Sequence, residues 1–191
     1  MDKRISRFLR RHHVLTLSSV SDAGSWTAHV FYAYMPDHEA LVFTTDPKTR
    51  HGREMLANPS VSGGIVLETK VVGRIRGVQL TGMVERAVLK GERRKEKGES
   101  EVVTRHSSLV TSSASRITYH VSRNTYLKRF PYAIAAKLDL WVLELEYVKM
   151  TDNRLGFGTK LEWRRETKDT RPETIDERQE TRDQRKRTLK R

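Results

Sequence analysis

Three cationic side chains, Lys48, Arg50 and Arg53, gather at the predicted start of a helix in the stretch FTTDPKTRHGREMLANP, residues 43–59. The positive end of the helix dipole disfavours cations there by a few tenths of a kcal/mol to about 1 kcal/mol each. A bound anion would offset this cost, because free backbone N–H groups, the Thr49 hydroxyl and the cations can converge on one phosphate group. A solvated basic face on a basic protein explains the same residues, so both interpretations stay open at this point.

The helix itself is predicted from its end signals. Asp46 is suited to the N-cap and Pro47 to the first helical position, while Asn58 and Pro59 follow the last helical residue, near Ala57. The apolar positions between them are sparse. We therefore expect a short, mostly exposed helix that follows a strand.

The composition excludes several kinds of chemistry. The 191 residues suffice for one domain with a core, and the absence of cysteine excludes disulfides, thiolate metal sites and a cysteine nucleophile. The pair His12 and His13 has no Asp, Glu or Cys partner at ligand spacing, so we expect no metal site. No apolar run is long enough for a signal peptide or a membrane span, which leads us to expect a soluble cytoplasmic protein.

The formal net charge of +13 is a weak pointer to a polyanion such as nucleic acid. The excess is spread along the chain, and no zinc finger, RNA-recognition motif or helix-turn-helix pattern accompanies it. Binding to nucleic acid is therefore only weakly supported.

Alternating apolar residues predict a mainly β protein. After an amphipathic helix over residues 2–12, strands are expected at 14–20, 26–35, 40–45, 61–68, 73–87 and 140–150, with a last strand ending near Trp163. Six or seven antiparallel strands with small helices favour a closed or nearly closed split β-barrel, since closure removes sheet edges.

Two of these strands carry more specific expectations. In residues 73–87 the alternation slips between Ile75 and Val78, which indicates a bulge at Gly77, and Gly82 is a second bulge or bend point. In residues 140–150, one face should present Trp141, Leu143, Leu145 and Tyr147, and the opposite face Glu144 and Glu146.

Three segments depart from the strand pattern. Residues 90–118 are charged and then rich in Ser and Thr, which predicts a mobile insertion. Residues 124–137 should contain a short helix or turn closed near Phe130. Residues 166–191 have mixed charge and almost no apolar side chains, so a charged disordered tail should follow a single domain over residues 1–165.

The order of these motifs resembles a known family. A strand, then FTTDPKTRHGREMLANPSVSGGIV, then RIRGVQLTGMVERA, is similar to the FMN-binding split-barrel family related to pyridoxamine-phosphate oxidase, in which a G-x-x-x-R-like segment ends the long strand. YLKRFP and MTDNRLGFGTKLEW resemble a narrower set, the YhbP-like bacterial proteins. The resemblance implies FMN as cofactor, and a homodimer with the cofactor at the subunit interface.

The same resemblance assigns residues to the cofactor. The phosphate would be held by Thr44, Thr45, Lys48, Thr49 and Arg50, with His51 where the family often has a second basic residue. The isoalloxazine ring would lie along His29, Val30, Phe31 and Tyr32, and Gln79 would be a ring contact. His29 could instead face solvent or a partner subunit. Trp141 is expected in the core, and Trp163 in the core or an interface.

Two functions follow from this reasoning. The first is an FMN-dependent oxidoreductase acting on a small molecule, with deazaflavin or haem as other cofactors that split barrels accept. Pyridoxamine-phosphate oxidation itself is disfavoured, because no second basic cluster for a phosphorylated substrate is recognisable. The alternative is a non-enzymatic binding module, a cofactor-free barrel that uses its basic surface for RNA or an acidic partner.

Overall fold

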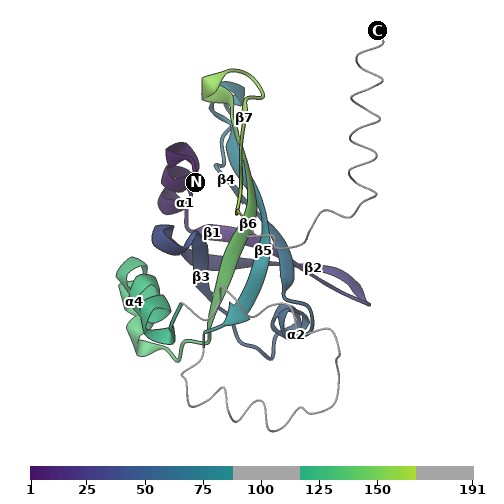
Figure 1. The fold of residues 1–191 in the computed structure, drawn as a ribbon, viewed down its shortest axis with the longest axis vertical. Helices are drawn as coiled ribbons and strands as arrows, with labels where there is room; N and C mark the ends of the chain where they lie inside the picture. Colours follow the sequence, from purple (N-terminus) through teal and green to yellow (C-terminus); the bar gives the residue numbers. More distant parts are fainter. Residues whose placement is uncertain (88–116, 167–191) are drawn as a thin grey trace, which may run out of the picture.

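A seven-stranded antiparallel sheet forms the centre of the computed structural model, which describes residues 1–87 and 117–166 (Figure 1). The strand order is β3-β2-β1-β4-β5-β6-β7, and an additional β3–β6 pairing closes six of the strands into a barrel. The strands are β1 (Val14–Ser21), β2 (Gly24–Met35), β3 (Ala40–Thr44), β4 (Ser60–Val66), β5 (Arg76–Arg86), β6 (Leu140–Asp152) and β7 (Lys160–Arg164). The prediction of a mainly β split barrel with six or seven antiparallel strands is confirmed.

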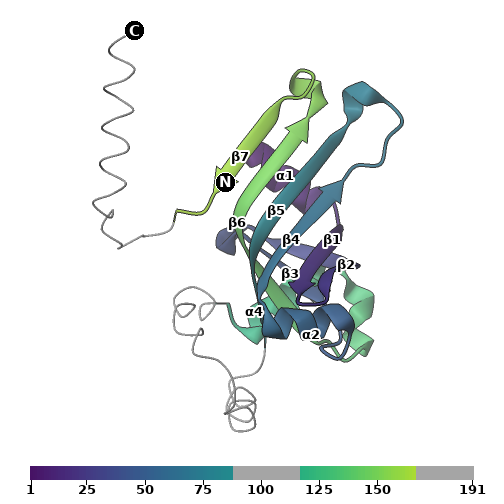
Figure 2. The ribbon, with the colours of Figure 1, turned by 90° about the vertical axis from the view of Figure 1, so that its right-hand side faces the viewer.

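Three α-helices and short 3₁₀ turns accompany the described part of the sheet. The helices are α1 (Lys3–Arg11), α2 (Arg50–Ala57) and α4 (Tyr119–Arg129), and the turns are η1 (Pro36–His38), η2 (Val72–Arg74), η4 (Pro131–Ala135) and η5 (Asn153–Leu155). Figure 2 shows the β4–β5 and β6–β7 hairpins extending beyond the closed part of the barrel. None of the helices in these two ranges has the length and apolar character that crossing a bilayer requires.

Helix α1 confirms the predicted N-terminal helix. Asp2 caps it by accepting a hydrogen bond of 2.7 Å from the backbone N–H of Arg4. Its apolar stripe, formed by Ile5, Phe8 and Leu9, is buried in the main core of the barrel. The helix thus covers the barrel with the face that the sequence periodicity indicates.

The register of the long strand β5 shifts at Gly82, which confirms one of the two predicted bulge or bend points, and the bulge predicted at Gly77 is wrong. Gly77 pairs in register with its neighbours on both sides, whereas the β5–β6 register shifts between Thr81 and Gly82. A Cβ at Gly82 would overlap the backbone carbonyl of Glu144, so only glycine allows the two strands this close approach.

Because of this bulge, the predicted faces of β6 are wrong after Leu145. Thr81 pairs with Tyr147 and Gly82 with Leu145, so Glu146 is the extra residue. Leu145 and Val148 therefore both point into the core, and Tyr147 turns to the face opposite Trp141. Trp141 is buried as predicted, and Trp163 is partly buried against the same core.

Helix α4 packs on the outside of the barrel and is longer than the predicted turn. Thr118 caps it, and Ile117 and Tyr126 bury themselves in a second apolar cluster with β2, β3 and β6. Residues 117 and 118 thus belong to the fold rather than to the predicted insertion. The rest of that segment, and the predicted tail beyond Glu166, lie outside the described residues.

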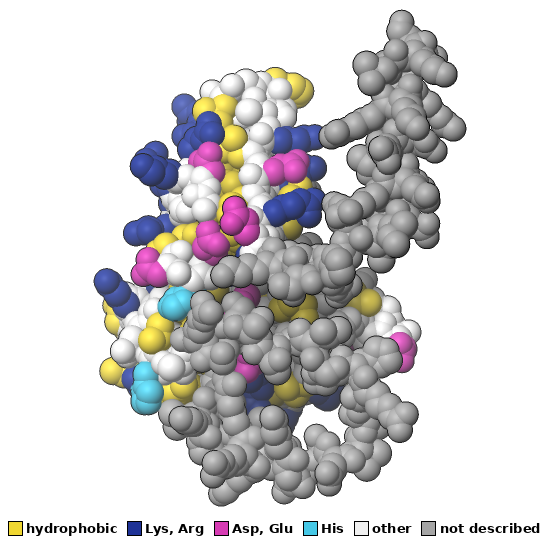
Figure 3. Space-filling view, viewed as in Figure 1, with side chains coloured by type: hydrophobic (Ala, Val, Ile, Leu, Met, Phe, Trp, Pro, Cys, Tyr) yellow, Lys and Arg dark blue, Asp and Glu magenta, His cyan; other side chains and the backbone are white. Residues whose placement is uncertain are grey.

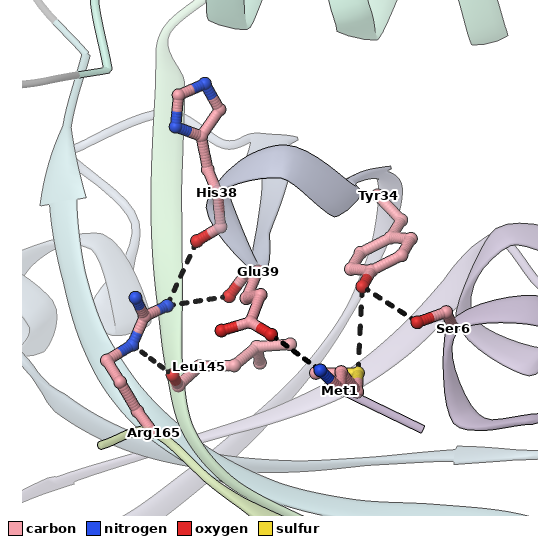
Figure 4. A network of polar contacts seen from close by, with 7 residues as sticks. All are labelled: Met1, Ser6, Tyr34, His38, Glu39, Leu145 and Arg165. Atoms are coloured by element: carbon pink, nitrogen blue, oxygen red, sulfur yellow. Dashed lines mark hydrogen bonds and ion pairs between the residues drawn. The ribbon is translucent and has the colours of Figure 1, made fainter. Parts of the chain in front are cut away.

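Arg165 fixes the end of β7 to the barrel. Its Nε donates to the carbonyl of Leu145 at 2.8 Å, and its Nη2 donates to the carbonyls of His38 and Glu39, each at 3.0 Å (Figure 4). The Glu39 carboxylate in turn lies 2.9 Å from the Met1 ammonium group. This network joins the two ends of the domain at the η1 turn.

Replacing Gly82 with alanine should destabilise the protein strongly. Because the added Cβ would overlap a backbone carbonyl that cannot move without breaking the strand pairing, we expect a loss of about 3 kcal/mol in the free energy of unfolding. Gly64→Ala is the matched control, since its Cβ would lie 3.6 Å from the nearest atom, the Val78 carbonyl oxygen. Urea denaturation measures both variants, and equal stability losses would contradict this account of the bulge.

Candidate functional site

The turn before α2 differs from the predicted helix start. The helix begins at Arg50 with Thr49 as N-cap, and Thr49 Oγ1 accepts a hydrogen bond of 3.1 Å from the Gly52 N–H. Asp46 caps the preceding turn instead, because its Oδ1 accepts a hydrogen bond of 2.7 Å from the Lys48 N–H. The predicted helix start is therefore three residues too early, and Lys48 lies in the turn rather than in the helix.

The turn lies directly against the helix that follows it. A Cβ at Gly52 would lie 2.6 Å from the Asp46 carbonyl oxygen and 2.8 Å from Pro47 Cα. Only glycine permits this approach, since real Cβ contacts are longer. Gly52 therefore fixes the position of the turn relative to the first helical residues.

A pocket of about 460 Å³ opens beside this turn. Two predicted residues, Thr44 and Lys48, line it together with Asp46, Pro47, Arg86, Lys137 and Asp139. The β3–β6 pairing, which places Thr44 opposite Leu140, brings the residues that precede β6 to this place. The pocket therefore collects three cationic side chains from three separate segments.

Sequence reasoning missed Arg86, Lys137 and Asp139. Arg86 closes the G-x-x-x-R segment that begins at Gly82, so the family pattern could have identified it. Lys137 and Asp139 carry no comparable signal, because only the pairing of distant strands places them here.

The predicted threonines already have hydrogen-bond partners within the protein. Thr44 Oγ1 donates to the Asp139 carbonyl at 3.0 Å, and Thr49 Oγ1 donates to the Asp46 carbonyl at 2.7 Å. Thr45 Oγ1 shares a hydrogen bond of 2.6 Å with His51 Nε2. Burial lowers the pKa of His51, so its imidazole is neutral at pH 7 and contributes a hydrogen-bonding group rather than a charge.

Arg50 does not line the pocket. Its Nε donates to Glu54 Oε1 at 2.9 Å, and its guanidinium lies 4.4 Å from the ring centroid of Trp26. The side chain is thus directed along α2 toward the β1–β2 hairpin, whereas Lys48 lies at the pocket.

Glu54 anchors α2 to the sheet. The residue is only 8% exposed, and its carboxylate accepts hydrogen bonds from Ser19 Oγ at 2.5 Å, from Ser21 Oγ at 3.1 Å and from Arg50. The hydrogen bonds from Ser19 and Arg50 lower the pKa of Glu54 below its ordinary value of 4.5. The anchor requires the ionised carboxylate, which accepts all of these bonds.

The residues predicted to lie along the ring alternate between the two faces of β2. Val30 and Tyr32 are buried, and Tyr32 donates its hydroxyl to the Leu9 carbonyl at 2.8 Å. His29 and Phe31 face outward, and His29 Nδ1 lies 3.1 Å from Thr16 Oγ1. Val30 and Tyr32 therefore belong to the core, and only His29 and Phe31 present side chains to the outside at this strand.

One edge of β2 lacks a strand partner at this point. Strand β3 pairs with β2 from Tyr32 onward, whereas residues 29–31 pair with β1 alone among the described strands. Backbone N–H and C=O groups on such an edge are suited to hydrogen bonding with a planar ligand.

Gln79 lies on the outer face of the sheet, in a second hollow of about 360 Å³. Small and polar residues from four strands surround it: Thr16, Ser18, Ser62, Gly63, Gly64, Leu80, Thr81 and Tyr147. Thr16, which lines this hollow, also contacts His29, because its Oγ1 lies 3.1 Å from His29 Nδ1. The predicted site residues therefore fall into two groups, one at the turn before α2 and one on the outer sheet face.

The surface view shows how the charges are distributed. On the uncovered part of the face in Figure 3, Lys and Arg side chains alternate with Asp and Glu rather than forming one continuous basic field. No group of three His, Cys, Asp or Glu side chains that could hold a metal ion occurs in residues 1–87 and 117–166.

The Glu54 anchor should make stability depend on pH. Because its folded pKa is lowered, the carboxylate contributes stability above pH 4.5, and this contribution is lost as the pH falls toward the folded pKa. In Glu54→Gln, thermal denaturation should show a lower Tm at pH 7 and a smaller fall in Tm between neutral and acidic pH. The exposed Glu68→Gln serves as control, and identical pH profiles for Glu54→Gln and the unsubstituted chain would refute the anchor.

Comparisons with known proteins identify the family of this chain. Residues 1–126 match the family described as pyridoxamine 5'-phosphate oxidase. A UPF0306 protein of Photorhabdus laumondii is 38% identical over 161 residues, which cover 84% of this chain and 94% of that protein. A UPF0306 protein of Serratia proteamaculans is 37% identical over 163 residues, which cover 85% and 94%.

Solved structures show the same fold at low sequence identity. A heme binding protein from Mycobacterium smegmatis has a TM-score of 0.57 at 18% identity, with 86% of this chain and 59% of that chain covered. A NimC/NimA family protein from Clostridium acetobutylicum has a TM-score of 0.50 at 15% identity, with coverage of 84% and 90%. The family match and the UPF0306 relatives together confirm the resemblance seen in the sequence, and the chain belongs to the pyridoxamine 5'-phosphate oxidase family.

Proposed function

We propose that this protein binds FMN and acts as a flavin-dependent oxidoreductase on a small molecule. The observation that carries the proposal is the pocket of about 460 Å³ beside Thr44 and Lys48, where cationic side chains and a polar turn converge. Its size lies within the usual range for small-ligand sites, roughly 300 to 1,000 Å³. When bound, FMN supplies the capacity to accept and donate electrons.

The donor set of the pocket fits a phosphate group. Lys48 and Lys137 are exposed cations at its rim. The single proton of the Thr44 hydroxyl is already donated to the Asp139 carbonyl, so the lysines are the donors of this set. The two carboxylates that also line the pocket are already engaged: Asp46 accepts from the Lys48 N–H, and Asp139 lies 3.4 Å from Arg86. In this arrangement Lys48 and Lys137 would hold the phosphate, and the neutral His51 would orient the adjacent Thr45.

The ring system would lie along the unpaired edge of β2. Residues 29–31 have no strand partner on the side of β3, so their backbone groups are available to the polar edge of a planar ring. This position places the ring next to the outward-facing His29.

We further propose that the protein is a homodimer with the cofactor at the interface. His29 and Gln79 both belong to the outer sheet face, which carries a hollow lined mostly by small residues together with Leu80 and Tyr147. A second copy packed on this face would cover the ring and complete the site. Sedimentation equilibrium should accordingly give the mass of two chains, and the mass of a single chain would contradict the dimer.

The absorbance spectrum of the purified protein tests the cofactor directly. We expect paired bands in the near-ultraviolet and the blue, and release of stoichiometric FMN on heating. A single intense band of the kind that haem gives would assign the site to a different cofactor. A colourless protein that also fails to bind added FMN, but binds RNA with a steep dependence on salt, would favour the binding module.

Replacing Lys48 should weaken FMN binding specifically. A charge-assisted hydrogen bond contributes about 1.5 to 3 kcal/mol, so Lys48→Gln should raise the FMN dissociation constant by about tenfold or more. Fluorescence titration measures the constant. The matched control is Lys70→Gln, an exposed lysine outside the pocket, and an equal effect of both substitutions would show that the phosphate does not lie at Lys48.

A further inference from the structure

The β4–β5 and β6–β7 hairpins end in tips that lie against each other. Asn153 joins them, because its backbone N–H donates to the Ile75 carbonyl at 3.1 Å and its Nδ2 donates to the Val72 carbonyl at 2.9 Å. Its Oδ1 accepts a hydrogen bond of 3.1 Å from the Gly158 N–H and so holds the loop that carries Phe157. The two tips therefore form one surface, which projects beyond the barrel at the end of the molecule opposite α2 (Figures 1 and 2).

This hairpin-tip surface exposes several large apolar side chains. Phe157 is 87% exposed, and Val71, Val72, Ile75 and Leu155 are exposed as well. Single apolar side chains on a protein surface are ordinary, but a group of five on two adjoining tips indicates a contact surface. In Figure 3, hydrophobic side chains reach the upper end of the molecule, where the tips lie, with Lys and Arg side chains beside them.

The charged side chains of the tips themselves are all cationic. Within residues 69–75 and 153–161 there is no Asp or Glu, and the exposed cations are Lys70, Arg74, Arg154 and Lys160. Arg154 is paired with the buried carboxylate of Asp152, whereas the other three form no ion pair with the described residues. Glu68 and Glu162 lie just outside the tips. The hairpin-tip surface therefore combines exposed apolar groups with uncompensated positive charge.

This combination matches the surface of a lipid bilayer. Phenylalanine and aliphatic side chains enter the boundary between headgroups and acyl chains, and lysine and arginine are attracted to anionic headgroups. A projecting tip also reaches a flat bilayer without obstruction by the barrel. Two copies that met tip to tip would instead bring the same cations together, which is unfavourable. We propose that the hairpin-tip surface docks the protein on bilayers that contain anionic phospholipids.

Co-sedimentation of the full chain with vesicles tests this proposal and needs no flavin. We expect binding to vesicles of equimolar phosphatidylcholine and phosphatidylglycerol, and much weaker binding to phosphatidylcholine alone, because only the first carries the negative charge that attracts the cations. A chain that does not bind the mixed vesicles would overturn the proposal.

Replacing Phe157 separates the hairpin-tip surface from the remaining basic surface of the chain. Phe157→Ala should weaken binding to the mixed vesicles by about tenfold, since it removes the most exposed apolar side chain of the tips. The matched control is Tyr132→Ala, which removes another almost fully exposed aromatic side chain, from η4 beside α4, and should leave binding unchanged. Equal binding by the two variants would show that the tips do not make the contact.

A fluorescent label identifies what covers the tips. Because the chain contains no cysteine, Leu155→Cys and Tyr132→Cys each provide a single thiol for an environment-sensitive fluorophore. The mixed vesicles should shift the emission to the blue for the label at position 155 and leave the label at position 132 unchanged. A blue shift at position 155 that appears without lipid and grows with protein concentration would assign the tips to an interface between copies, against the proposal.

Discussion

The pairing of β3 with β6 is the constraint on which the rest of the structure depends. It joins residues about one hundred positions apart and converts the sheet into a closed barrel. The indole of Trp141 reinforces this closure, because its Nε1 donates to the Thr45 carbonyl at 2.9 Å while the ring is buried in the core. Without this pairing, the residues before β6 would not approach the turn after β3, and the pocket between them would not exist.

The position of α2 depends on two further constraints. Glu54 ties the helix to the serines of β1, and Gly52 lets the turn of residues 46 and 47 pack against the helix backbone. Both residues lie on a helix whose exposed face carries the basic side chains. The geometry of the candidate phosphate site therefore rests on a buried carboxylate and a glycine that need not touch the ligand themselves.

Several arginine side chains stabilise the fold through hydrogen bonds, so the high arginine content does not require a polyanion ligand. Arg129 caps α1, Arg165 holds the end of β7, and Arg154 neutralises the buried Asp152. Each guanidinium donates to two or more acceptors, which its planar shape with five N–H groups favours. A net charge of +13 is thus consistent with a protein that uses cations as structural donors.

Local periodicity and end signals in the sequence determined much of the fold. The apolar spacing of residues 2–12 predicted α1. The alternation of apolar residues predicted β1, β2 and β3 within one or two residues of their observed bounds. The motif order also identified the family, because strand, turn and helix follow one another within a short stretch of chain. Thr44 and Lys48, the two predicted residues that line the pocket, lie in that same short stretch.

Tertiary structure alone decided the features that depend on contacts between distant segments. The sequence predicts a bulge or bend at both Gly77 and Gly82, and only the close approach of β6 at Gly82 decides between them. Arg86 and Lys137 reach the pocket through the closure of the barrel, and Arg50 turns toward Glu54, which is itself fixed by strand β1. Sequence patterns record which residues share a local face, whereas the partners of a side chain across the barrel are set by packing and strand register, which no short stretch of sequence contains.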